Sequence, residues 1–168
     1  MKSIAARRMA KGAVMFSMIF AAAWLTGCQS LGQHDVGRMV PDSNRVAIPS
    51  TGTDSHTFET NDMTVQYQCR KVDYKLKIWG SGKIHFESVR ELVFHVYFLD
   101  ARGKVIGVRN FYSFVDEEDF EILKFNEPLF NCDLTIPAGA VAFAIGYDGQ
   151  TGGDKDEDNI AFSHFPFE

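Results

Sequence analysis

The acidic run at residues 148–159 is the part of the sequence whose spacing is most suggestive of metal chemistry. It reads DGQTGGDKDEDN, and Asp154, Asp156 and Asp158 occupy alternate positions within it. Calcium takes about six to eight oxygen ligands on an adaptable backbone, and acids at alternate positions can turn their oxygens inward. The glycine and the final glutamate of an EF-hand loop are absent. A solvated acidic loop is therefore the preferred interpretation, and a calcium site is the alternative.

Histidines raise a second metal hypothesis. His85 and His95 fall in neighbouring predicted strands, with Glu87 and Glu91 nearby and His164 in the last predicted strand. Zinc would need three or four of these side chains to converge on one point, and their spacing does not impose that. Histidines with a structural role are the preferred interpretation.

Sequence motifs of known catalytic sites are missing from the chain. It contains no G-x-S-x-G, H-E-x-x-H or P-loop sequence, and Gly80-Ser81-Gly82 is predicted to be a turn. We therefore predict a non-enzymatic binding or accessory module. A small hydrolase with an unrecognised site, built on a concave pocket, is a further alternative.

The start of the chain has the pattern of a secretory signal. Residues 1–11 carry four basic side chains and no acid, and residues 13–25 are uncharged and mostly apolar. This apolar run is shorter than the roughly 20 residues that a membrane-spanning helix needs. The pattern predicts export, and an uncleaved signal anchor is the alternative.

The apolar run ends in Leu25-Thr26-Gly27-Cys28, which resembles the lipobox of bacterial lipoproteins at all four positions. The resemblance implies that a diacylglycerol is attached to the Cys28 thiol and that the signal is cut between Gly27 and Cys28. Two or more acyl chains give stable anchoring without a membrane span. Gln29 follows the cysteine where such lipoproteins of the inner membrane carry an aspartate, so we expect an outer-membrane anchor.

Charge limits the classes of partner. The chain has 17 basic and 22 acidic residues, and the four basic residues of the signal leave a formal charge of −9 on the remainder. Such a balance argues against nucleic acid as a partner. It favours a cation or a basic protein surface, and we predict another envelope protein as the partner.

Two cysteines remain once Cys28 is assigned to the lipid. Cys69 and Cys132 both fall on the inward phase of their predicted strands. An exported protein meets an oxidising compartment, where a bond between them would close a loop of about 60 residues and stabilise the fold by about 4 kcal/mol. Two buried free thiols are the alternative, since neither cysteine has C-x-x-C spacing.

Strand patterns begin only after a long polar segment. In residues 29–57 more than half of the side chains are Ser, Thr, Gly, Pro, Asn or Asp, without helical or strand periodicity. We expect residues 28–57 to be a flexible tether with a reach of about 30 Å. Residues 58–168 are long enough for one domain with one core.

Alternation of apolar and polar residues predicts strands in that domain. Residues 63–71 and 74–78 alternate strictly, residues 91–100 are apolar on both faces, and residues 104–115 form the next run after a predicted type I turn. Further strands flank Pro137-Ala138-Gly139, a short helix is the alternative at residues 116–125, and the strand near Pro166 ends the chain. Short strands at this spacing predict an all-β fold, a single antiparallel immunoglobulin-like β-sandwich.

Two segments of this domain resemble FxLYD-like, immunoglobulin-fold envelope lipoproteins. These are VYFLDARGKVIG, residues 96–107, and LTIPAGAVAFAI, residues 134–145. The resemblance implies the sandwich fold and an envelope location. Together with the lipobox it leads us to expect a lipid-anchored binding or accessory module on the periplasmic side or the outer surface of the outer membrane.

Overall fold

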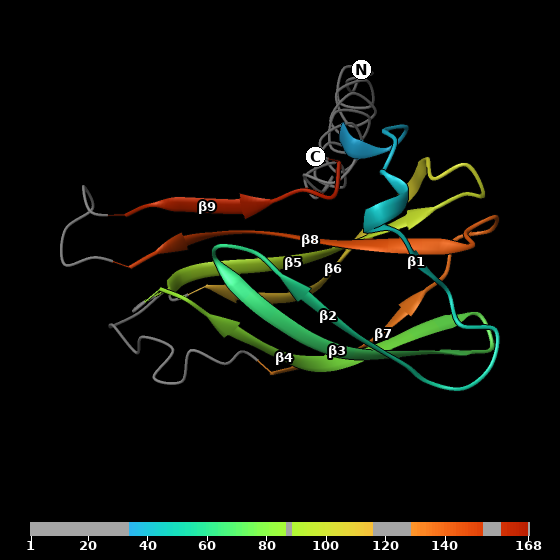
Figure 1. The fold of residues 1–168 in the computed structure, drawn as a ribbon, viewed down its shortest axis with the longest axis horizontal. Helices are drawn as coiled ribbons and strands as arrows, with labels where there is room; N and C mark the ends of the chain where they lie inside the picture. The colour runs from blue at the N-terminus through green and yellow to red at the C-terminus, as the bar shows by residue number, and fades with distance from the viewer. Residues whose placement is uncertain (1–33, 87–88, 116–128, 153–158, 168) are drawn as a thin grey trace, which may run out of the picture. The chain divides into compact units, whose positions relative to one another are not determined.

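Two antiparallel sheets face each other in the computed structural model, which describes residues 34–86, 89–115, 129–152 and 159–167 (Figure 1). The four-stranded sheet has the order β2-β3-β4-β7. The five-stranded sheet has the order β1-β8-β5-β6, and its β9 also pairs with β8. An all-β, antiparallel sandwich is confirmed. The strands are β1 Val46–Ala47, β2 Asp54–Glu59, β3 Met63–Val72, β4 Lys75–Ile84, β5 Val89–Leu99, β6 Val105–Val115, β7 Leu129–Thr135, β8 Ala142–Thr151 and β9 Ala161–His164.

Alternation fixes which face of each strand is buried. In β3 the side chains of Met63, Val65, Tyr67 and Cys69 are buried, and the residues between them are more exposed. Strand β5 is apolar on both faces because β6 and β8 flank it and side chains cover both of its faces. The predicted strands at residues 63–71, 91–100 and 104–115 are confirmed.

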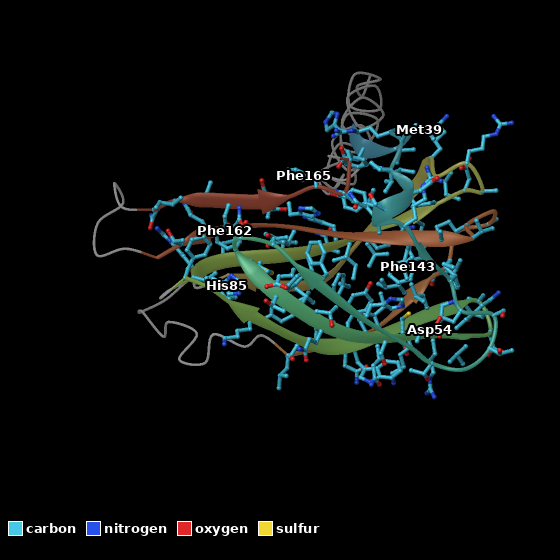
Figure 2. All side chains as sticks on the ribbon, in the orientation of Figure 1. Met39, Asp54, His85, Phe143, Phe162 and Phe165 are labelled. Carbon is cyan, nitrogen blue, oxygen red and sulfur yellow. The ribbon has the colours of Figure 1, made fainter. Side chains whose placement is uncertain are left out.

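The main core lies between the sheets and is rich in aromatic rings. Phe94 of β5, Tyr147 of β8, Phe130 of β7 and Phe162 of β9 belong to it. A second, smaller core covers the outer face of the five-stranded sheet, where Val40 packs with Tyr97 and Leu99 of β5 and with Phe165. Figure 2 shows Phe143 on the side of β8 that faces the four-stranded sheet and Phe165 and Met39 on the other side.

The amino-terminal boundary differs from the prediction. Residues 34–57 belong to the compact unit His34–Glu168 and do not form a flexible tether. They contain a 3-10 turn, η3 Asp42–Asn44, the strand β1, and most of β2, while Val40 is buried. Polar composition hid these elements, because β1 is only two residues long and β2 is an edge strand with exposed side chains.

Turns were predicted with mixed success. The turn at residues 100–103 is confirmed by a hydrogen bond from the Gly103 N–H to the Asp100 carbonyl oxygen at 3.0 Å. The turn at Pro137-Ala138-Gly139 is also present, since the Ala140 N–H donates to the Pro137 carbonyl oxygen at 3.1 Å. The strands on either side of this turn, β7 and β8, lie in different sheets. The predicted turn at Gly80-Ser81-Gly82 is wrong, since these residues continue β4. Residues 116–125 lie outside the described part of the chain.

Candidate functional site

A pocket of about 410 Å³ opens where the free edges of the two sheets face each other. Its lining comes from both sheets and from the segment before β1. A cavity of this volume is large enough for a small ligand or a large side chain. The lining residues are Ser43, Asn44, Arg45, Val46, Ala47, Asp54, His56, Thr57, Phe58, Tyr67, Ile145 and His164, and Figure 2 shows Asp54 at the start of β2.

The pocket exists because two short strands share one edge of β8. Strand β1 pairs with residues 142–143 and β9 with residues 147–150, so residues 144–146 pair with neither strand. Ile145 lies in this gap and lines the pocket. The Asn44 side-chain amide bridges the two ends by donating to the Pro166 carbonyl oxygen at 3.1 Å.

The His56 ring and the Tyr67 hydroxyl are two polar groups that line the pocket. The His56 ring stacks on Tyr67 with centroids 5.3 Å apart, and its buried Nε2 has no hydrogen-bond partner among the described residues. Burial, helped by the neighbouring Cys69, raises the pKa of the Tyr67 hydroxyl. That hydroxyl therefore stays protonated and can donate a hydrogen bond. A buried nitrogen without a partner costs free energy, which a ligand in the pocket would recover.

The opposite wall is aromatic and well supported. Phe58 lies edge-on to His164, with centroids 4.8 Å apart, and His164 stacks on Tyr147. The Tyr147 hydroxyl donates to Asp62 at 2.9 Å and lies 2.6 Å from the Thr60 hydroxyl oxygen. This wall is therefore fixed by hydrogen bonds at the turn between β2 and β3. Together the walls suit a group that combines an apolar surface with a polar end.

Strand β2 presents an open backbone edge beside the pocket. It pairs with β3, and within the described residues no other strand pairs with it. The Thr60 N–H donates to the Met63 carbonyl oxygen, so antiparallel alternation turns the backbone groups of Ser55, Thr57 and Glu59 toward the free edge. Such an edge can accept an additional strand.

A buried histidine lies on the outer face of the five-stranded sheet. The His95 Nδ1–H donates to the Asn110 side-chain oxygen at 2.9 Å, and Nε2 contacts the Asp148 carboxylate. Burial alone would lower the pKa of His95, but the hydrogen bonds to Asp148 and Asn110, with the charges of Asp148 and Asp35, outweigh it and raise the pKa. Both ring nitrogens are occupied, so this group has no free position for a substrate.

The histidines named as possible metal ligands do not converge. His85 bonds to the Asn61 carbonyl oxygen, His95 lies on the outer face of its sheet, and His164 lines the pocket. Among the residues that the structure describes, no group of three or more His, Cys, Asp or Glu side chains could hold a metal ion. Glu87, Asp154, Asp156 and Asp158 lie outside those residues, and the calcium site stays a prediction.

The predicted disulfide between Cys69 and Cys132 is wrong. Both cysteines are free, and each pairs with Ile78 from opposite sides of β4. Two strand spacings separate their Cα atoms by about 10 Å, beyond the roughly 7 Å that a disulfide allows. Burial raises the pKa of each thiol to about 11. The inward phase of both cysteines is correct, since both pack against the main core.

Sequence reasoning missed the residues that form the pocket. His56 and most of β2 fall in the segment predicted to be a tether, and Tyr67 falls in the strand predicted at residues 63–71, for which no binding role was predicted. The apolar Phe58 two residues after His56 was the available signal for a strand. Cys28 and Gly27 lie outside the described residues, so lipidation at Cys28 and cleavage before it stay predictions.

Known proteins give no further guide to this site. Neither the protein-family models, the curated proteins nor the solved structures contain a match to the chain. Among the residues described, no helix has the length and apolar character required to cross a membrane.

Proposed function

We propose that this protein is a lipid-anchored envelope module that binds an extended segment of another envelope protein. The segment adds as a strand to the free edge of β2 and places one side chain in the pocket. The observation that carries this proposal is the pocket beside the open strand, with an unpartnered His56 Nε2 inside it. The proposed role is non-enzymatic.

Geometry supports strand addition over capture of a free small molecule. The outward backbone groups of Ser55, Thr57 and Glu59 offer a ladder of donors and acceptors. His56 and Phe58 point inward from the same strand and line the pocket. A strand bound to β2 would direct alternate side chains toward that pocket, which gives both affinity and specificity.

A matched pair of variants tests the strand-addition step. Thr57→Pro removes one outward N–H without breaking the ladder to β3, and Thr57→Ala keeps that N–H. We expect in-cell photo-crosslinking from position 55 to give a defined partner adduct with the wild type and with Thr57→Ala, but not with Thr57→Pro. The same adduct with all three chains, when all three have equal melting temperatures, would contradict the proposal.

Lipid anchoring at Cys28 is the second part of the proposal and rests on the LTGC sequence and the short apolar run before it. The anchor would hold the domain on the outer membrane. Growth with a labelled fatty acid should label the wild-type protein and leave Cys28→Ala unlabelled. Mass spectrometry of the amino-terminal peptide should find a diacylglyceryl cysteine, and an unmodified Cys28 in the membrane fraction would contradict the anchor.

A further inference from the structure

The outer face of the four-stranded sheet carries an unusual set of side chains. Trp79 lies at its centre on β4, with Gln68 of β3 and Asn131 of β7 directly opposite on either side. Gln66 and Ser81 form the next cross-strand pair. Trp79 is partly exposed, and the neighbouring amides and hydroxyl are exposed or partly exposed. We call these five residues the Trp79 platform.

The β3–β4 hairpin that carries this platform is basic, whereas the chain as a whole has a formal charge of −5. One acid, Asp73, accompanies five basic residues between positions 63 and 84. Within the described residues none of the five forms a salt bridge, while Arg38 and Arg45 are each paired with an aspartate. The five basic residues are Arg70, Lys71, Lys75, Lys77 and Lys83.

Two of these cations face each other across the β3–β4 hairpin. Arg70 and Lys77 lie directly opposite each other in the β3–β4 register, beside the Trp79 platform. Asp133 of β7 lies directly opposite Lys77 on its other side, so Lys77 has one like charge and one opposite charge as cross-strand neighbours. The Arg70 guanidinium carbon also lies 5.9 Å from the centre of the Trp79 ring. An anion bound between the Arg70 and Lys77 side chains would have a charged hydrogen-bond donor on each side.

We propose that the Trp79 platform and its flanking cations bind an acidic polysaccharide. The indole face of Trp79 stacks on the apolar face of a sugar ring. The amides of Gln66, Gln68 and Asn131 both donate and accept hydrogen bonds, as sugar hydroxyls require. Arg70 and Lys77 bind the acid groups of the chain.

A polysaccharide fits this face better than an anionic lipid surface does. The platform lies on one face of the sheet, and three of its five side chains are amides. Amides pressed against lipid would lose hydrogen bonds to water, whereas sugar hydroxyls replace those bonds. The site lies on the opposite face of the four-stranded sheet from the pocket, so its ligand is separate from the partner proposed above.

Tryptophan fluorescence tests the proposal directly. The chain has two tryptophans, Trp24 and Trp79, and Trp24 lies in the predicted signal. We expect titration of the lipidated protein in detergent with polygalacturonate to change the Trp79 emission, and neutral dextran to leave it unchanged. Binding should weaken as salt increases, because exposed charges are screened.

Variants separate the platform from general charge effects. We expect Lys77→Gln to weaken polygalacturonate binding about tenfold, the effect of losing one charge-assisted hydrogen bond. Lys104→Gln, at an exposed cation in the turn before β6, should leave the affinity unchanged. Trp79→Phe keeps a stacking ring and should bind, whereas Trp79→Ala should not, as read by calorimetry.

Four results would overturn the proposal: equal affinity for dextran, equal weakening by Lys77→Gln and Lys104→Gln, tighter binding to phosphatidylglycerol vesicles, or tighter binding to single-stranded DNA. If Trp79→Ala fails to fold, the comparison of Lys77→Gln with Lys104→Gln decides whether the platform binds the polysaccharide. His56→Ala, at a side chain on the pocket side of the sheet, should bind polygalacturonate as the wild type does, which separates this site from the proposed function.

Discussion

Replacing Phe94 with alanine removes the ring at the centre of the main core. Phe94 is fully buried and contacts four other rings, with centroids 5.3 Å from Phe111, 5.9 Å from Tyr112, 5.7 Å from Phe130 and 6.1 Å from Tyr147. These partners come from three strands of both sheets. The cavity left by Phe94→Ala is therefore bounded by rigid rings and by backbone that cannot collapse into it.

The expected loss of unfolding free energy is about 4 kcal/mol, within the range for buried phenylalanine. For a domain of this size that loss lowers the melting temperature by about 10–20 °C. Phe94→Leu fills most of the space and should cost about 1–1.5 kcal/mol. Urea unfolding followed by circular dichroism measures both variants. A loss below about 1.5 kcal/mol for Phe94→Ala would refute the view that these rings bridge the two sheets.

Three further predictions concern the buried histidine, the two cysteines and a close backbone contact in the four-stranded sheet. His95 has a raised pKa in the fold, so its contribution to the free energy of unfolding is complete below about pH 6.5 and is lost as the pH rises through the folded pKa. Urea unfolding between pH 6 and 9 should show this decline in the wild type. The variant His95→Phe should not show it. Cys69 and Cys132 should react slowly with a thiol reagent at pH 8 and rapidly in urea, since burial raises both thiol pKa values to about 11; a folded protein that reacts at once would contradict the buried positions. Gly80→Ala should lower the free energy of unfolding by about 1–3 kcal/mol, because a Cβ at this position would overlap a backbone carbonyl oxygen of β3. An unchanged melting temperature would contradict this expectation and show that the sheet can adjust.

Sequence alternation was sufficient to predict the central part of the fold. The two-residue period of β3 and the doubly apolar run of β5 follow directly from which faces are covered, and both are visible in the residue types. The turn at Asp100 and Gly103 was equally clear, because its residue types match the backbone it needs. Gly103 has a φ of +84°.

Pairing between distant strands could not be read from the sequence. Cys69 and Cys132 were both expected to point inward, and they do, but nothing in either segment indicates that β4 lies between them. Edge strands give a similarly weak signal. Strand β2 is polar because one face is exposed and its free edge meets solvent, so its residues looked like those of a linker.

The edge of β8 that pairs with both β1 and β9 also constrains the order in which parts of the protein can fold. Strand β1 comes from the start of the domain and β9 from its end, and the hydrogen bond from Asn44 to Pro166 spans 122 residues. Contacts so distant in sequence form late, because a long loop must close before they contribute. The second core needs Val40 and Phe165 together. A chain synthesised from its amino terminus therefore cannot complete this edge, or the pocket beneath it, until residues 161–166 have emerged.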